Sequence, residues 1–177
     1  MTDGKGCIHI YCGDGKGKTS AAIGLAVRAA GRGRRVLIAR FLKTDDSGEV
    51  PVLSHIPGIT VLPCQKTFGF VSRMSEEQKK EAAACYSTLF ASVSRRAVEE
   101  DYDVLILDEI LVACSCGLVE ECRVIRFLET RQEKLEVVLT GRGPSREILE
   151  LADYVSEIQM NKHPFTVGLK AREGIEY

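Results

Sequence analysis

The sequence predicts an α/β fold: a doubly wound, mainly parallel sheet in a single domain spanning residues 1–177. The chain is long enough for one well-buried domain of this kind and too short for two ordinary ones. Apolar residues make up 45% of the chain and charged residues 28%, a globular balance with no bias toward disorder. Short apolar runs alternate with segments of helical period over the whole length, the pattern from which right-handed crossovers build a parallel sheet.

The apolar runs and helical periods divide the chain into elements in a regular order. The predicted strands are residues 7–12, 36–41, 59–62, 104–107, 136–140 and 154–160, and the last is expected to be a core strand. The predicted helices are residues 19–30, 75–100 and 119–130, with a capping box at 75–78 and a further short helix opening at 144–145. Residues 64–74 have no clear period and are predicted to form a loop.

Four polar segments directly follow predicted strands. They are residues 13–20, 41–44, 108–109 and 140–142. In sheets of this kind, ligands bind outside the carboxyl ends of the strands. The sequence therefore predicts an active site along that edge of the sheet.

Composition and charge narrow the class of partner. A net charge of -1 gives no general case for binding nucleic acid or an acidic membrane. No apolar run approaches the roughly 18 residues that a bilayer requires, and the start lacks the apolar core of a secretion signal. A cytoplasmic location with reduced cysteines is therefore expected. For Cys114, Cys116 and Cys122, ordinary packing near a strand end is favoured over a metal or redox role, because neither a CxxC pair nor a nearby histidine is present.

The segment after the first strand is rich in glycine and lysine and leads straight into a helix. Glycines let the backbone wrap closely, so successive N–H groups point at phosphate oxygens, and the helix start adds its positive dipole end. Lys18 is expected to neutralise the β/γ oxygens, and the Thr19 hydroxyl to bind Mg²⁺. The loop is one residue shorter than the common pattern and carries an extra cation at Lys16. The candidate nucleotide-binding residues here are Gly13, Asp14, Gly15, Lys16, Gly17, Lys18, Thr19 and Ser20.

An apolar strand that ends in Asp108 and Glu109 fits the second half of such a site, because P-loop proteins hold magnesium with a carboxylate at a strand end. One carboxylate is expected to reach the metal or its water, and the other to orient a neighbour. Together the loop and the strand end predict a sheet of the P-loop NTPase (RecA-like) type. The candidate metal ligands are Thr19, Asp108 and Glu109, and the candidate catalytic residues are Lys18, Lys16 and Glu109.

Three further side chains are weaker candidates for binding. Arg142 follows a later strand and Lys43 follows the second strand, and for each a contact with an anionic group is favoured over a solvated turn. Glu49, in the next loop, is weaker still from the residues alone.

Taken together, these motifs resemble those of the ATP:corrinoid adenosyltransferase family over nearly the whole chain. The resemblance rests on GDGKGKT at 13–19, RAAGRG at 28–33, RFLK at 40–43, GE at 48–49, LDE at 107–109, LTGR at 139–142, LAD at 151–153, SE at 156–157, KHPF at 162–165 and GIEY at 174–177. The short loop and the tail are the distinctive parts, since a generic P-loop protein would not share that tail.

The resemblance implies a transfer reaction in the synthesis or salvage of adenosylcobalamin. A reduced corrinoid with Co(I) attacks the 5′ carbon of ATP, and inorganic triphosphate leaves. ATP as co-substrate, Mg²⁺, a homodimer and an electron-donating flavoprotein partner are implied in the same way. Phe70 and His163 become candidate binding residues, although a hydrogen-bonded structural role for His163 stays equally open.

Two departures from the family pattern concern the corrinoid side. The family commonly carries Gly-Phe-Thr-Trp, whose aromatic rings help to displace the lower axial ligand of cobalt. The matching stretch here is residues 69–72, which keeps Phe70 but has Ser72 in the tryptophan position, and the chain contains no tryptophan. Family members also often have a segment ahead of the first strand that covers the site, whereas about six residues precede that strand here.

Two alternative functions remain open from the sequence. A P-loop ATPase or phosphotransferase shares Gly-Lys-Thr and Asp-Glu, and it would produce ADP. A non-catalytic ATP- and corrinoid-binding protein would bind both molecules without converting either.

Overall fold

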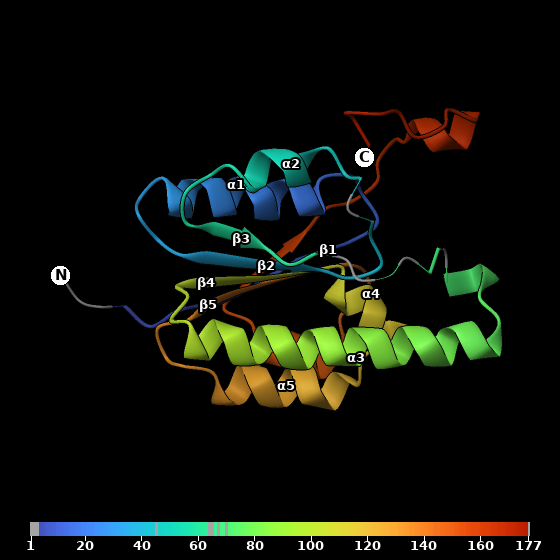
Figure 1. The fold of residues 1–177 in the computed structure, drawn as a ribbon. Coiled ribbons are helices and arrows are strands. Elements are labelled where there is room, and N and C mark those ends of the chain that lie inside the picture. The colour runs from blue at the N-terminus through green and yellow to red at the C-terminus, as the bar shows by residue number, and fades with distance from the viewer. Residues whose placement is uncertain (1–3, 45, 64–65, 67, 70, 177) are drawn as a thin grey trace.

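The computed structural model describes residues 4–44, 46–63, 66, 68–69 and 71–176, which form one sheet with helices on both faces (Figure 1). The six strands pair in parallel in the order β3-β2-β4-β5-β1-β6. Their bounds are β1 Ile8–Cys12, β2 Val36–Arg40, β3 Ile59–Val61, β4 Val104–Asp108, β5 Glu136–Thr140 and β6 Tyr154–Glu157. The predicted doubly wound α/β sheet is thus confirmed, with every described strand pair parallel.

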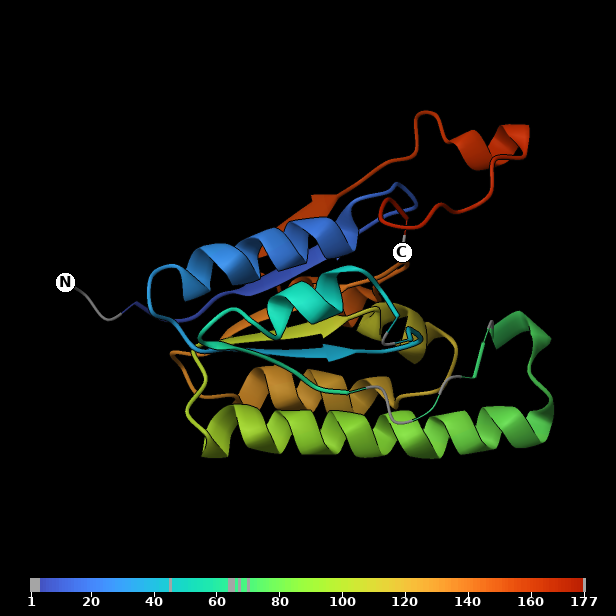
Figure 2. The same ribbon diagram turned by 45° about the horizontal axis from the view of Figure 1, so that its top comes forward.

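The helices divide between the two faces of the sheet (Figures 1 and 2). Helices α1 (Lys18–Ala30) and α2 (Glu49–Leu53) cover one face, and α3 (Glu76–Glu99) and α5 (Glu121–Thr130) cover the other. The remaining elements are α4 (Ile110–Ser115), α6 (Arg146–Glu150) and the 3-10 turns η1 (Val71–Arg73) and η2 (Pro164–Val167). The predicted capping box is present, since the Ser75 side chain accepts from the Gln78 amide and the Gln78 side chain accepts from the Ser75 amide. Helices α2 and α4 were not predicted, because each is too short to show a helical period.

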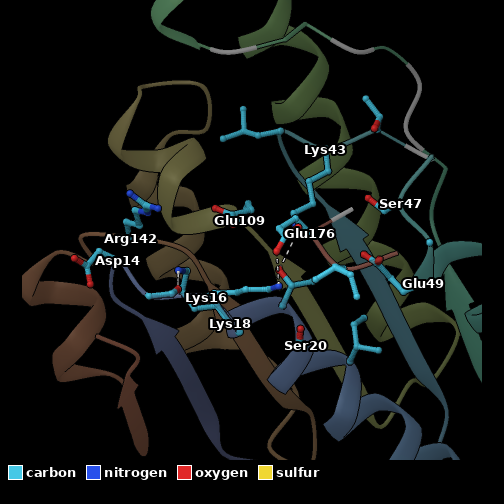
Figure 3. A pocket seen from close by; sticks show the side chains of 18 of the residues that line it. Asp14, Lys16, Lys18, Ser20, Lys43, Ser47, Glu49, Glu109, Arg142 and Glu176 are labelled. Atoms are coloured by element: carbon cyan, nitrogen blue, oxygen red, sulfur yellow. Dashed lines mark hydrogen bonds and ion pairs between the residues drawn. The ribbon is translucent and has the colours of Figure 1, made fainter. Parts of the chain in front are cut away.

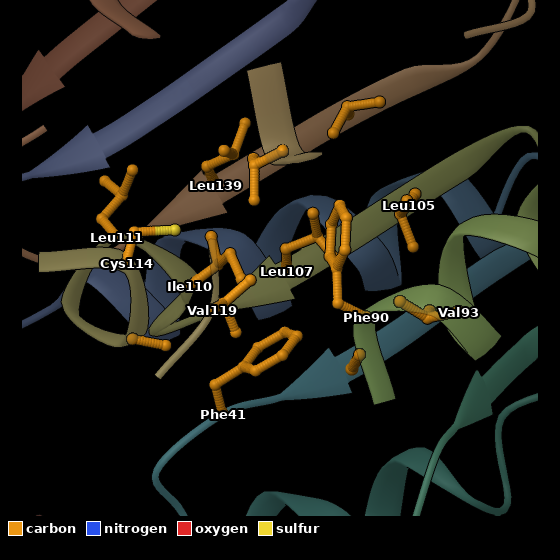
Figure 4. Packing of buried hydrophobic residues seen from close by; sticks show 14 of the residues in the cluster. Phe41, Phe90, Val93, Leu105, Leu107, Ile110, Leu111, Cys114, Val119 and Leu139 are labelled. Atoms are coloured by element: carbon orange, nitrogen blue, oxygen red, sulfur yellow. The ribbon is translucent and has the colours of Figure 1, made fainter. Parts of the chain in front are cut away.

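The core lies on both faces of the central strands, and Figure 4 shows the cluster on the face that α3 covers. Successive side chains of a strand point to opposite faces, so Leu105 and Leu107 pack with Phe90 of α3, whereas Val104 and Ile106 pack under α1. All five residues of β2 and all five of β4 are buried, as expected for parallel strands that are covered on both faces. These two buried strands rigidly position the residues that follow them.

Strand β6 differs from the prediction of a core strand. All four of its residues are exposed, with Tyr154 at 55% and Val155 at 50%. The strand pairs with β1 at the edge of the sheet, where the His9 ring stacks on Tyr154 with the ring centroids 4.6 Å apart. Its apolar pattern indicated a strand correctly. The position at the edge follows from strand order, which short-range patterning does not encode.

Two other predictions concern the packing of the cysteines and the absence of a membrane-spanning segment. Cys114 is buried in the core as expected, but Cys116 and Cys122 are exposed, so ordinary packing was the wrong interpretation for these two. Within the described part of the chain, no group of three or more His, Cys, Asp or Glu side chains is arranged to hold a metal ion. None of the helices among the described residues has both the length and the apolar character needed to cross a membrane.

Candidate active site

A pocket of about 1040 Å³ opens at the carboxyl ends of the strands (Figure 3). Residues from all four predicted polar segments line it, and the end of the chain adds a further wall. Of the predicted site residues, the pocket lining includes Asp14, Gly15, Lys16, Gly17, Lys18, Thr19, Ser20, Lys43, Glu49, Glu109, Arg142 and His163. The structure therefore brings together side chains that are up to about 150 positions apart in the sequence.

The second half of the 13–20 loop forms the start of α1. Gly17, which precedes the helix, has φ 121°, a backbone conformation that only glycine adopts readily. Lys18 is 7% exposed, and its Nζ donates to the Gly15 carbonyl oxygen at 2.8 Å. Burial is the largest influence on the Lys18 ammonium and lowers its pKa, while the Glu109 carboxylate acts in the opposite direction. Among the described residues no carboxylate forms an ion pair with Lys18, so this buried cation faces the pocket ready for an anion.

The first half of the same loop is held by the chain beyond β6. The Gly15 amide donates to the Ile158 carbonyl at 2.8 Å, and Asp14 Oδ1 accepts from the Met160 amide at 2.8 Å. A Cβ on Gly13 would lie 2.4 Å from the Ile158 oxygen, and a Cβ on Gly15 would lie 2.8 Å from the same atom. These glycines thus permit close contact with residues 158–160, a role that the sequence did not reveal, and the Gly15 amide is already occupied.

Four side chains form the strand-end cluster, which we define as Thr19, Lys43, Asp108 and Thr140. Asp108, at the end of β4, is fully buried. Its Oδ1 accepts hydrogen bonds from the Thr19 hydroxyl at 2.9 Å and the Thr140 hydroxyl at 2.6 Å. Its Oδ2 accepts from Lys43 Nζ at 2.6 Å, and the same nitrogen donates to Thr19 Oγ1 at 2.6 Å. Oδ1 thus accepts two hydrogen bonds and Oδ2 accepts one, from donors in three different segments, which fixes the orientation of Asp108.

Glu109 adopts a left-handed backbone with φ 62°, uncommon for a residue with a side chain. Its amide donates to Thr140 Oγ1 at 2.8 Å, and its side chain lines the pocket. Burial, followed by the charge of Asp108, raises the pKa of the Glu109 carboxyl, while Lys43, Lys18 and Arg142 oppose this rise. Strained backbone at such a position is typical of functional sites, where the surrounding structure holds it.

The C-terminal segment, which we define as residues 158–176, returns to the 13–20 loop. Lys16 Nζ donates to Glu176 Oε1 at 3.0 Å, and Arg172 donates to both oxygens of the same carboxylate at 3.0 and 3.1 Å (Figure 3). Hydrogen bonds from Arg172 and then from Lys16 lower the pKa of Glu176 to about 2. The Lys16 side chain is 47% exposed, so this contact lies at the mouth of the pocket.

The other predicted residues differ in where they lie relative to the pocket. Ser20, Glu49 and Arg142 line the pocket, whereas Gly13 lines an adjoining hollow and Asp108 lies buried beneath. His163 lines the pocket and also caps η2, because its Nδ1 accepts from the Phe165 amide at 3.2 Å, so both of its predicted roles remain open. Phe70 lies outside the described residues, and Ser72 is exposed in η1.

Sequence reasoning missed several residues of the site. Thr140 falls within a predicted polar segment, but its contact with Asp108 was not predicted, although strand register places the end of β5 beside that of β4. Ser47 is buried and lines the pocket just before Gly48, without a motif of its own. Tyr86 lines it from α3, where it packs edge-on against Phe68 with centroids 5.8 Å apart, and no sequence motif marked it.

Solved structures with a similar fold are P-loop ATPases. The cytoplasmic domain of EssC superposes with a TM-score of 0.55 at 16% identity, covering 96% of this chain and 34% of that one. ATPases 2 and 3 of EssC from Geobacillus thermodenitrificans superpose with a TM-score of 0.51 at 13% identity, covering 99% and 36%. At these identities the likeness shows the fold alone, and it confirms the predicted P-loop type of sheet.

Sequence comparisons are more specific. The chain is 35% identical to the corrinoid adenosyltransferase of Escherichia coli, covering 99% of this chain and 87% of that protein. It is 37% identical to corrinoid adenosyltransferase CobA of Salmonella typhimurium (98% and 86%) and 31% identical to the Pseudomonas aeruginosa protein (99% and 85%). The family described as ATP:corrinoid adenosyltransferase BtuR/CobO/CobP matches residues 4–177, the range that holds both the 13–20 loop and the C-terminal segment beside it. A match of this extent confirms the resemblance drawn from the motifs: the chain belongs to the ATP:corrinoid adenosyltransferase family.

Proposed function

We propose that this protein transfers the 5′-deoxyadenosyl group of ATP to the cobalt of a Co(I) corrinoid and releases inorganic triphosphate. The observation that carries the proposal is a single pocket lined by both a buried lysine and aromatic side chains. Lys18, Glu109, Phe68 and Tyr86 all line that pocket. At about 1040 Å³ it reaches the upper end of the range of about 300–1,000 Å³ typical of small-molecule sites.

The positively charged side chains of the pocket indicate how it would bind the triphosphate. Cobalt attacks C5′ of ATP with its electron pair, the bond between C5′ and oxygen breaks, and that pair leaves with the triphosphate. Negative charge therefore grows on the leaving oxygen, where preorganised cations stabilise it. Lys18, desolvated at the start of α1, supplies the nearest fixed positive charge, and Lys16 and Arg142 add to it from the rim.

A magnesium ion is the expected companion of the triphosphate, and the residues present fit it. Thr19, Asp108 and Glu109 offer hydroxyl and carboxylate oxygens, the donors that Mg²⁺ prefers. The strand-end cluster already attracts a cation, since the Lys43 ammonium contacts both Thr19 Oγ1 and Asp108 Oδ2 at 2.6 Å. Magnesium, when bound, would neutralise charge on the phosphate oxygens. Thr19 and Asp108, whose side chains are hydrogen-bonded to each other, would hold it together with Glu109.

The corrinoid side depends on shape and on exclusion of water. Phe68 and Tyr86 line the pocket and pack edge-on with their ring centroids 5.8 Å apart, and the Phe41 ring lies 6.0 Å from that of Tyr86. Such a wall suits the apolar face of a flat macrocycle and keeps water from a strongly reducing metal centre. Because Ser72 stands where the family has tryptophan, we propose that displacement of the lower ligand rests on Phe70 or Phe68.

An adenosylation assay tests the proposal. The protein is incubated with ATP, Mg²⁺ and chemically reduced cobalamin, with formation of the light-sensitive adenosylated product as the signal. Triphosphate is the expected second product. ADP would instead indicate an ATPase or phosphotransferase, and binding of both substrates without turnover would indicate a non-catalytic protein. Folded protein that forms no adenosylated corrinoid contradicts the proposal.

The same assay tests whether the protein prefers a corrinoid that lacks a lower ligand over cobalamin. A corrinoid without a lower ligand is run in parallel with cobalamin, and a strong bias toward it is the result expected if Ser72 weakens ligand displacement. We also propose a cytoplasmic homodimer that receives its electron from a flavoprotein. Sedimentation velocity tests the dimer, and replacing the chemical reductant with a reduced flavoprotein tests the electron donor.

A further inference from the structure

Lys43 makes two contacts that generic phosphate binding does not explain. Its ammonium does not reach freely into the pocket but donates to Thr19 Oγ1 and Asp108 Oδ2, both at 2.6 Å. The side chain is 23% exposed and that of Asp108 is 1% exposed, so the ion pair is largely withdrawn from water. A cation with this geometry is held by the site itself.

The turn that delivers Lys43 is built for this position. The Phe41 amide donates to the Asp108 carbonyl at 2.9 Å, which joins the end of β2 to the end of β4. Leu42 follows with φ 58°, a left-handed conformation that side chains rarely adopt. Arg40 Nη1 donates to the Thr44 carbonyl at 2.8 Å and so ties the far side of the turn. These constraints from both sides direct Lys43 across the strand ends toward Asp108.

The atoms that Lys43 contacts are the atoms expected to face magnesium. Mg²⁺ needs oxygen ligands at about 2.0–2.1 Å in a nearly octahedral shell, so it has no room beside an ammonium that contacts the same oxygens. Charge opposes a free metal ion as well, because Lys43, Lys18 and Arg142 all act on neighbouring Glu109. ATP would reverse that balance by bringing several negative charges into the pocket. It would also offer Lys43 new anionic partners within reach of its flexible stem.

We infer that Lys43 and magnesium compete for the oxygens of Thr19 and Asp108, and that Lys43 keeps divalent cations out of the strand-end cluster until ATP binds. Lys43 is then a positioning residue: it keeps Asp108 and Thr19 oriented and neutralised, and it gives way when metal and nucleotide enter together. The inference rests on the proposed magnesium site and adds an order of events to it. Binding of free metal is disfavoured, and binding of metal with nucleotide is favoured.

Binding of Mn²⁺, a paramagnetic substitute for Mg²⁺, tests this without any turnover. Water-proton relaxation distinguishes protein-bound Mn²⁺ from Mn²⁺ that is free or complexed with ATP alone. Wild-type protein without nucleotide should bind Mn²⁺ weakly. The variant Lys43→Met should bind it at least about tenfold more tightly, because the lost charge is worth more than that at contact distance.

Matched variants exclude trivial causes. Lys134→Met removes one positive charge from the turn before β5, at the amino-terminal end of that strand and so away from the pocket. Lys134 pairs there with Asp101. The substitution should leave Mn²⁺ binding unchanged. Lys43→Arg keeps the charge and should bind Mn²⁺ as weakly as wild type, whereas Asp108→Asn combined with Lys43→Met should abolish the gain. Lys43→Gln repeats the test if the methionine variant does not fold, and added Mg²⁺ should raise the Tm of either neutral variant more than that of wild type.

The outcomes separate two kinds of failure. If wild type with ATP forms no ternary complex with Mn²⁺, the proposed magnesium site is wrong. If that complex forms but Lys43→Met and Lys43→Gln bind free Mn²⁺ no better than wild type, Lys43 does not guard the site and only this inference is overturned. Tight binding of Mn²⁺ by wild type without ATP overturns it as well.

Discussion

The strand-end cluster and the C-terminal segment border the same pocket but are held there in different ways. Asp108 and Thr140 of the cluster are buried, and Thr19 and Lys43 are half-buried. The strands β2, β4 and β5 that lead into it pair on both sides, and each oxygen of Asp108 accepts at least one hydrogen bond. The C-terminal segment follows an exposed edge strand, and Phe165 and Val167 within it are 76% and 84% exposed. Backbone contacts at residues 158–160 and the ion pair between Lys16 and Glu176 link it to the loop.

The difference indicates a division of labour within one site. Catalysis by charge stabilisation needs groups that are already oriented before reaction, which a hydrogen-bonded cluster around a buried carboxylate provides. Access for a substrate as large as a corrinoid needs a wall that moves at small cost, which an exposed segment held by a few contacts provides. Changes in the cluster should therefore affect stability and chemistry strongly, and changes in the segment should affect access weakly.

The largest expected effect comes from Asp108→Ala. The substitution leaves the Lys43 ammonium and two hydroxyls without their shared acceptor in a buried place. Removing one partner of a buried ion pair typically costs about 3–5 kcal/mol. Urea denaturation should show a loss of this size. The control is Glu150→Ala, which removes an exposed acid of α6 and should cost no more than about 0.5 kcal/mol. Equal losses in both variants would contradict the contrast between buried and exposed acids.

The next largest effect is a difference in kcat/KM between variants of two lysines in the same loop. Lys18→Met should lower kcat/KM by about 10²–10³, the usual cost of removing one preorganised group that stabilises developing charge. Lys16→Met should lower it by less than about tenfold, because Lys16 is exposed and already paired with Glu176. Steady-state adenosylation kinetics measure both. A larger loss in the Lys16 variant would show that the rim, not the buried lysine, carries the triphosphate.

Prediction from sequence succeeded where local pattern determines structure. Strands β1, β2, β4 and β5 were recognised because each is an apolar run next to a glycine, a turn or a carboxylate, and their parallel order then brought the polar segments together. Asp108 follows from that logic alone because it ends a strand, whereas Lys18 also needed the glycine-rich pattern between β1 and α1. For this reason the predicted edge of the sheet is the observed one.

Prediction failed where long-range contacts decide. The order β3-β2-β4-β5-β1-β6 leaves β6 at the edge, which its own residues do not reveal. The contacts of residues 158–160 with Gly13 and Gly15 join positions about 145 apart, so these glycines were assigned to phosphate alone. The pairing of Lys43 with Asp108 likewise depends on β2 and β4 being neighbours in the sheet. The sequence had singled out each of these residues, but for another role.

The contributions of two pocket glutamates to stability should change with pH in opposite directions. Burial raises the pKa of Glu109 above its usual 4.5, so folding favours its protonated form. Its contribution to stability is full below pH 4.5 and is lost as pH rises through the folded pKa. Glu109→Gln should therefore gain stability relative to wild type as pH rises across that window. The pKa of Glu176 lies near 2, so its contribution is present above pH 4.5 and fades as pH falls toward 2. Urea midpoints from pH 2 to pH 8 measure both, and slopes of equal sign would contradict the prediction.

The smallest expected effect comes from Glu176→Gln at neutral pH. The substitution keeps the shape of the side chain but frees the Lys16 ammonium from a competing carboxylate. The KM for ATP should therefore fall, by no more than about fivefold because the pair is exposed. The difference from wild type should shrink as salt rises, since the screening length falls from about 30 Å at 0.01 M to about 3 Å at 1 M. Hydrogen exchange at residues 170–176 should rise in the same variant, while exchange in β4 stays unchanged. If KM rises instead, Glu176 contributes to binding of the nucleotide, and the C-terminal segment belongs with the strand-end cluster as part of the fixed site.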